Sequence, residues 1–111
     1  EKRTDPAMIR HIVMWTLKDE AEGADRRTNM QKVRQLLESC RDCVPGILEF
    51  EVGLASDGHE ATHDVVLNSL FASREALDAY QAHPRHVAIK PFMGAVRADR
   101  ACLDYDLPAA R

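Results

Sequence analysis

The most distinctive stretch of this sequence reads Tyr80-Gln-Ala-His83-Pro84-Arg85-His86-Val87. Because a residue that precedes proline is disfavoured in the helical region, His83 should end the helix that carries Tyr80, and His86 should lie beyond the bend. A histidine with a pKa near ~6.5 transfers protons readily at neutral pH. The stretch therefore indicates either a site of proton transfer or a proline-terminated helix end with a capping histidine.

The residues on either side of this bend have helical periodicity. Ser73 is a suitable N-cap for a helix that turns Leu77 and Tyr80 toward the core. Beyond the bend, apolar residues recur at helical spacing over residues 87–98, but Pro91 interrupts them. We therefore expect a short turn and then a new helix that begins near Pro91.

An earlier segment, residues 25–43, has apolar residues at spacings of three and four with charged residues between them. This pattern predicts an amphipathic helix on a core, and Pro45 with Gly46 should end it. Cys40 and Cys43 close the helix as a C-x-x-C pair. Because a redox pair normally opens a helix and no second pair completes a zinc site, we expect neither a redox nor a metal role.

Four segments have the composition or the alternation of β-strands, namely residues 8–17, 47–55, 62–71 and 101–107. The first is apolar on both faces, since Val13 and Trp15 share one face and Ile12 and Met14 share the other. Both faces should therefore be covered. Helices can cover one face, and either pair can belong to the face that they leave bare.

The order strand, helix, strand, strand, helix, strand predicts an α+β fold of the ferredoxin-like type, a four-stranded antiparallel sheet with helices on one face. A bare apolar sheet face on a soluble protein marks an association surface. We expect a homodimer that pairs two open sheet faces into an α/β barrel.

The 111 residues are enough for one domain, which we assign to residues 8–107. Residues 1–7 are polar and lack a pattern, so we interpret them as a remnant of cloning. Residues 108–111 should form a frayed tail.

Charge and composition exclude several partner classes. The net charge is −3, which offers no basis for binding nucleic acid. No apolar stretch approaches the ~18 residues that a membrane helix needs. Three cysteines, an odd number, favour reduced thiols. We expect a cytoplasmic protein with no membrane or nucleic-acid partner and no cofactor.

Several stretches together resemble the stress-responsive A/B barrel (Dabb) domain family. They are Ile9-Arg-His11-Ile-Val-Met-Trp-Thr-Leu-Lys18, Pro45-Gly46-Ile47, Phe71-Ala-Ser73, Ala76-Leu77, Tyr80-Gln-Ala-His83-Pro84-Arg85-His86 and Asp104-Tyr105. The resemblance covers nearly all of residues 8–107, and its most specific piece is the Tyr-x-x-His-Pro-x-His run. It implies a ferredoxin-like subunit that dimerises into an α+β barrel, but it does not fix an activity.

A more distant resemblance is to a plant polyketide cyclase of this family, which makes olivetolic acid by a cofactor-independent aldol closure. That resemblance implies that His86 is a general base, that Tyr80 hydrogen-bonds the substrate, and that His11 lines the cavity. A further cavity histidine of the cyclase falls on Val65 here, so this sequence departs from the pattern, although His63 lies two residues away.

These observations leave three functions open. The first is a dimer that binds a small apolar or aromatic molecule in a cavity between helices and sheet, lined by Val13, Trp15, Val65, Leu77, Ile89 and Phe92. The second is an enzyme that uses Tyr80, His86 and His11 for proton transfer. The third is a structural, stress-protective oligomer whose interior is filled. A haem- or oxygen-using monooxygenase would need a ligand set that the sequence does not offer.

Overall fold

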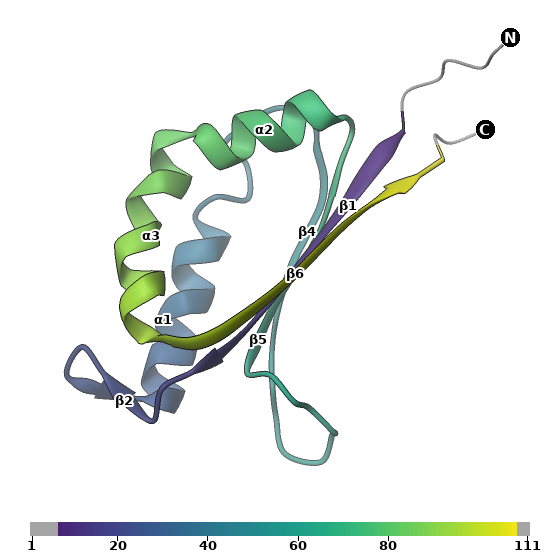
Figure 1. Ribbon diagram of the computed structural model, residues 1–111. Helices are drawn as coiled ribbons and strands as arrows, with labels where there is room; N and C mark the ends of the chain where they lie inside the picture. The colour runs from purple at the N-terminus through teal and green to yellow at the C-terminus, as the bar shows by residue number, and fades with distance from the viewer. Residues whose placement is uncertain (1–6, 109–111) are drawn as a thin grey trace, which may run out of the picture.

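A computed structural model describes residues 7–108 of the chain. The expected remnant and tail therefore lie outside the described residues, apart from Ala7 and Pro108. The elements follow in the order β1 (Met8–Leu17), β2 (Glu20–Ala21), β3 (Ala24–Asp25), α1 (Arg26–Glu38), β4 (Ile47–Leu54), β5 (Val65–Phe71), α2 (Arg74–Ala82), α3 (Pro84–Val96) and β6 (Arg97–Leu107) (Figure 1).

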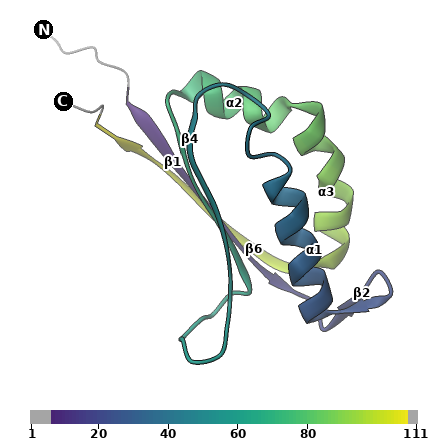
Figure 2. The ribbon, with the colours of Figure 1, turned by 180° about the vertical axis from the view of Figure 1, so that it is seen from behind.

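The main sheet is antiparallel, with the strand order β4-β5-β1-β6. Figures 1 and 2 show α1, α2 and α3 on the same side of this sheet, while its other side is bare. The predicted α+β, ferredoxin-like architecture is confirmed. None of the helices within residues 7–108 is long and apolar enough to cross a membrane.

The register of β1 shows which of its two apolar faces meets the helices. Val13 and Trp15 are 2% and 6% exposed and belong to the core, whereas Ile12 and Met14 are only half-buried. Because side chains alternate along a strand, Ile12 and Met14 lie on the bare side. Their partners across the ladder to β6 are Leu103 and Ala101. We call this side the open face.

Helix α1 ends at Glu38, about one turn before the predicted end at Cys43. The chain continues in tight turns, in which Cys40 N–H donates to Leu37 O at 2.9 Å and Arg41 N–H donates to Glu38 O at 3.1 Å. Cys40 is nevertheless fully buried. The apolar spacing therefore continues past the helix because the turns keep the same side toward the core.

His83 joins two helices. It ends α2 and begins α3, with its backbone extended, and its Nδ1 atom accepts a hydrogen bond from Arg85 N–H at 3.0 Å. Pro84 follows at the first position of α3, where a missing N–H costs little. The predicted boundary near Pro91 is wrong, because α3 runs unbroken through it. Pro91 and Val87, four residues earlier, are both exposed, so water can satisfy the carbonyl that proline leaves unpaired.

Candidate functional site

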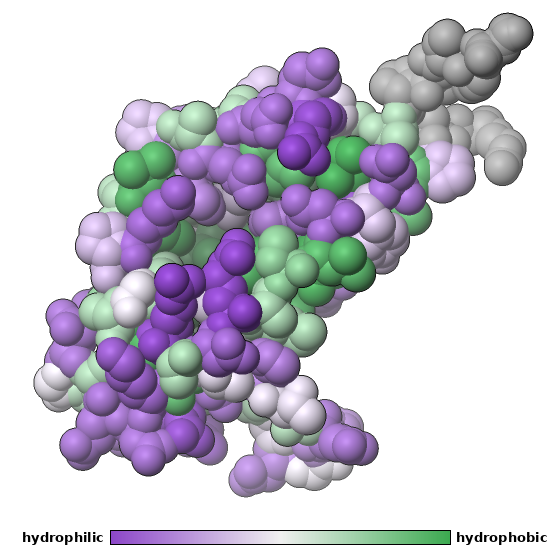
Figure 3. Space-filling view, in the orientation of Figure 1, coloured by the Kyte–Doolittle hydropathy of each residue, from purple (hydrophilic) through white to green (hydrophobic). Residues whose placement is uncertain are grey.

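A cavity of about 440 Å³ opens between the helices and the sheet. Its apolar lining consists of Val13, Trp15, Leu37, Leu67, Ile89 and Met93. In Figure 3, hydrophilic side chains surround a recess between α3 and β6. Cavities of this size accommodate small organic molecules.

Three of the six side chains predicted to line the cavity, Val13, Trp15 and Ile89, do so. Val65, Leu77 and Phe92 are not among its lining residues, which corrects that part of the prediction. Leu77 is 1% exposed within the packed core. Val65, the first residue of β5, is 2% exposed and borders a second hollow of about 520 Å³. The ring of Phe92 faces away, with Lys32 Nζ 5.1 Å from its centroid.

The cavity brings together the three residues with protic side chains that the sequence singled out. His11, Tyr80 and His86 all line it. The ring centroids of Tyr80 and His86 are 4.6 Å apart, and those of His11 and Tyr80 are 6.4 Å apart. The bend at His83 and Pro84 turns His86 back toward α2, so the proline in the motif produces this convergence.

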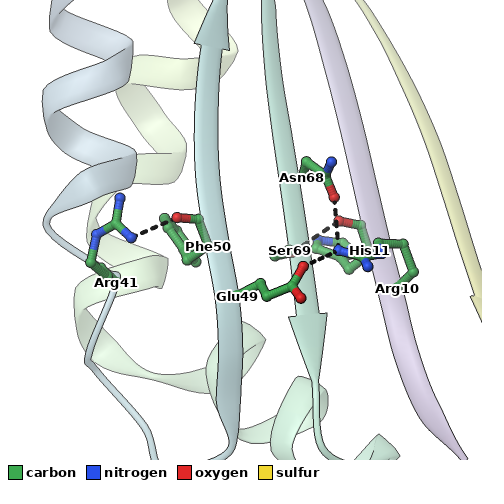
Figure 4. A network of polar contacts seen from close by, with 7 residues as sticks. All are labelled: Arg10, His11, Arg41, Glu49, Phe50, Asn68 and Ser69. Atoms are coloured by element: carbon green, nitrogen blue, oxygen red, sulfur yellow. Dashed lines mark hydrogen bonds and ion pairs between the residues drawn. The ribbon is translucent and has the colours of Figure 1, made fainter. Parts of the chain in front are cut away.

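His11 is fixed from two sides. Its Nδ1 atom lies 2.5 Å from Asp104 Oδ1. Its carbonyl accepts a hydrogen bond from the fully buried Ser69 hydroxyl at 2.9 Å, as Figure 4 shows. An ionised carboxylate only accepts hydrogen bonds, so Nδ1 of His11 carries a proton in this pair. The second ring nitrogen, Nε2, is then the one available to a ligand in the cavity.

Asp104 was not among the site residues inferred from the sequence, although the Asp104-Tyr105 pair was noted. It becomes recognisable only through the strand register, in which Asp104 pairs with His11 across the ladder between β1 and β6. Alternation within one strand does not reveal which residue faces it on the neighbouring strand.

Tyr80 is fully buried, and its hydroxyl oxygen has no hydrogen-bond partner among residues 7–108. Burial raises the pKa of the Tyr80 phenol far above its usual value. The group therefore stays protonated and can donate a hydrogen bond. A buried polar group without a partner costs about 1–3 kcal/mol, which a ligand that accepts this bond would recover.

Among the side chains that line this cavity, His86 is well suited to accept a proton. Its Nδ1 atom is buried and has no hydrogen-bond partner within the described part of the chain. Burial, with a further contribution from the positive charge of Lys90, lowers the pKa of His86 below its ordinary value. The imidazole is therefore neutral at pH 7, as a general base must be.

The mouth of the cavity carries three basic residues, Lys90 from α3 and Arg97 and Arg100 from β6. The sequence offered little indication of them, because they belong to no motif and come together only where α3 turns into β6. These three side chains make the mouth of the cavity positively charged.

Two further groups of side chains contain residue types that bind metal ions or carry out redox chemistry. His11, Cys102 and Asp104 place potential metal-ligand atoms within 4.8 Å of one another, but the hydrogen bond between His11 and Asp104 accounts for most of that closeness. Cys40 and Cys43 are free thiols whose pKa values are raised by burial. A raised pKa disfavours the reactive thiolate, so these cysteines are poorly suited to redox chemistry.

The family model described as "Stress responsive A/B Barrel Domain" matches residues 9–107. A search of curated proteins found none that matches. Among solved structures, a dimeric protein of unknown function with a ferredoxin-like fold from Bacteroides fragilis is 29% identical, with a TM-score of 0.76 over 90% of this chain and 96% of that one.

Two other solved structures share the fold. A Dabb family protein from Mesorhizobium loti is 24% identical, with a TM-score of 0.64 over 94% of this chain and 99% of that one. The hydroxynitrile lyase from Passiflora edulis is 18% identical, with a TM-score of 0.72 over 96% of this chain and 98% of that one. At these identities the similarity shows a common fold.

Proposed function

The chain belongs to the stress responsive A/B barrel domain family, and we propose that it binds a small apolar or aromatic molecule in the cavity between its helices and its sheet. The observation that carries this proposal is the cavity itself, with about 440 Å³ of space and His11, Tyr80 and His86 in its wall. A purely structural oligomer would fill this space with side chains, because protein interiors are close-packed.

We further propose that the working form is a homodimer that buries the open face, and that it is cytoplasmic, in keeping with its three free cysteines. Leu103 and Tyr105 lie on the open face and are 62% and 44% exposed, a large apolar exposure for one strand. The related protein from Bacteroides fragilis is described as dimeric.

Cofactor-independent proton transfer is the second candidate function. It is favoured by the pairing of His11 with Asp104 and by the lowered pKa of His86, which supplies a neutral base. In this scheme His86 removes a proton next to a carbonyl group, and Tyr80 donates a hydrogen bond to the developing enolate oxygen. The hydroxynitrile lyase with the same fold indicates that this architecture is compatible with catalysis.

Blocking the cavity tests the proposed ligand site. Gly94 lines the cavity, and a Cβ atom there would meet nothing within 4 Å, so Gly94→Phe should place its ring in the space. Calorimetry with 1-naphthamide should detect binding to the wild type and at least a tenfold loss in Gly94→Phe. Ala88→Phe, at an exposed position of α3 outside the cavity, is the matched control and should bind normally.

Two results would contradict the proposal: no binding to the wild type, or equal binding to both variants. Proton transfer is tested separately with 2-tetralone, whose acidic C–H groups exchange with deuterated water. His86→Gln should abolish any acceleration of that exchange while binding stays within tenfold.

A further inference from the structure

The mouth of the cavity is unusually rich in positive charge for a chain with a net charge of −3. Lys90, Arg97 and Arg100 all line it, and all three are exposed. They come from two elements, the middle of α3 and the first residues of β6. The junction between these elements thus gathers three cations at one opening.

These three cations lack partners within residues 7–108, where no hydrogen bond or ion pair of their side chains is found. Other arginines of the chain do have carboxylate partners. Arg10 Nη1 lies 2.8 Å from Glu49 Oε1 on the open face (Figure 4), and Arg74 Nε lies 3.4 Å from Asp78 Oδ1. The carboxylate of Asp104 pairs with His11, a residue of the cavity wall.

The positive charge reaches into the cavity. Lys90 and Arg100 both contribute, after burial, to the lowered pKa of His86. A cleft with apolar walls concentrates such a field and attracts ions of the opposite sign. The same field disfavours a divalent cation at the group formed by His11, Cys102 and Asp104.

We propose that the ligand of this cavity is an organic anion, an aromatic or conjugated carboxylic acid. Its apolar body lies on the floor formed by Val13, Trp15 and Ile89, and its carboxylate lies between Arg97 and Arg100 at the mouth. Guanidinium groups match carboxylates through paired hydrogen bonds. This inference rests on the proposed function and adds the charge of the ligand to it.

The interior of the cavity is consistent with a second polar group on the same ligand. Tyr80 lines the cavity, its buried hydroxyl has no partner among the described residues, and its raised pKa keeps it a donor. A carbonyl or phenolic oxygen on the aromatic body would accept that bond. The preferred ligand therefore has a carboxylate at one end and an uncharged oxygen at the other.

Two pairs of probes separate charge from shape: 1-naphthoate with 1-naphthamide, and benzoate with benzamide. Within each pair the ring is the same and only the charge differs. Calorimetry at low salt should show that each acid binds at least ten times more tightly than its amide. Addition of 0.5 M NaCl should remove most of this preference, because salt screens exposed charges.

The double variant Arg97→Gln/Arg100→Gln should weaken binding of 1-naphthoate at least tenfold and leave binding of 1-naphthamide within twofold. The matched control is Arg27→Gln/Arg34→Gln on α1, which removes the same net charge from exposed positions outside the cavity. It should change neither affinity by more than twofold. Circular dichroism checks that both double variants remain folded.

The outcomes distinguish the two levels of the proposal. If acid and amide bind equally and the cavity arginines have no effect, the ligand site stands and the preference for an anion is overturned. If both double variants weaken the acid equally, the effect belongs to net charge and the inference is also overturned. If no probe of either charge binds the wild type, the ligand cavity itself is refuted.

Discussion

The Nδ1 atom of His11 lies 2.5 Å from the Oδ1 atom of Asp104, across the ladder between β1 and β6. The His11 side chain is 3% exposed and that of Asp104 is 30% exposed, so the pair spans the boundary between core and solvent. A hydrogen bond of this kind selects one tautomer of the imidazole and leaves Nε2 free for the cavity.

Removing the Asp104 carboxylate should therefore release the tautomer of His11. In Asp104→Ala, side-chain ¹⁵N NMR should show a mixture of Nδ1-H and Nε2-H forms, where the wild type shows Nδ1 protonated. Asp106→Ala removes a carboxylate from the same face of β6, beside Ile9, and should leave the His11 signals unchanged. An unchanged tautomer in Asp104→Ala would show that another group orients His11.

The pKa of His86 should make stability depend on pH. Its folded-state pKa lies below the ordinary 6.5 through burial and Lys90, and the other titratable or charged groups around it are Tyr80, His11 and Arg100. As the pH falls below about 6.5, the unfolded chain takes up a proton that the folded chain does not, so the free energy of unfolding decreases.

Urea denaturation between pH 7.5 and 5 measures this loss. His86→Gln should flatten the profile over that range, while His59→Gln, in an exposed turn, should retain the wild-type slope. A His86→Gln profile that parallels the wild type would mean that His86 does not titrate differently on folding.

Much of this fold follows from periodicity, and the exceptions have physical reasons. The β-branched and aromatic residues of β1 and the capping residue Ser73 were sufficient to place a strand and a helix. Pro91 was misleading, because an exposed proline lets water replace the lost hydrogen bond. Leu48 lies two residues before the buried Phe50, so alternation alone would bury it, but a register shift between Ile47 and Glu49 leaves it 52% exposed.

Some residues of the candidate site could likewise be predicted from the sequence, and others could not. Tyr80 and His86 could be predicted from the sequence because they lie within one motif, where local bends decide their arrangement. Asp104, Arg97 and Arg100 could not be predicted, because their roles depend on strand register and on where α3 meets β6. Long-range pairing of this kind has no local signal in a single sequence.

Gly46 should tolerate no side chain. Its φ of +91° lies in the left-handed region, and a Cβ atom there would approach the Ala76 Cβ to 2.8 Å, which would displace α2 and with it Tyr80. Gly58 has a φ of +93° but nothing within 4 Å, so Gly58→Ala isolates the backbone cost of about 1–2 kcal/mol.

Gly46→Ala should cost about 1–3 kcal/mol more than Gly58→Ala, because the close contact adds to the backbone strain. Chemical denaturation of both variants measures the difference in the free energy of unfolding. Equal losses in the two variants would mean that α2 accommodates the extra methyl group freely.

The open face provides a test of the dimer. Light scattering should give twice the 12.5 kDa chain mass for the wild type, and Leu103→Arg should give a monomer, because it places a charge within the apolar face. Val87→Arg changes a residue of similar exposure, 47%, on α3 and should remain dimeric. A monomeric wild type at micromolar concentration would refute the barrel.

The histidines themselves report most directly on whether the cavity binds a ligand. His11 and His86 line the cavity, His59 and His63 line the second hollow, and His83 caps α3. Titration with uncharged 1-naphthamide, followed by side-chain ¹⁵N NMR, should shift the signals of His11 and His86 and leave the other three in place. Shifts at His59 and His63 instead, or none at any histidine, would contradict the proposed site.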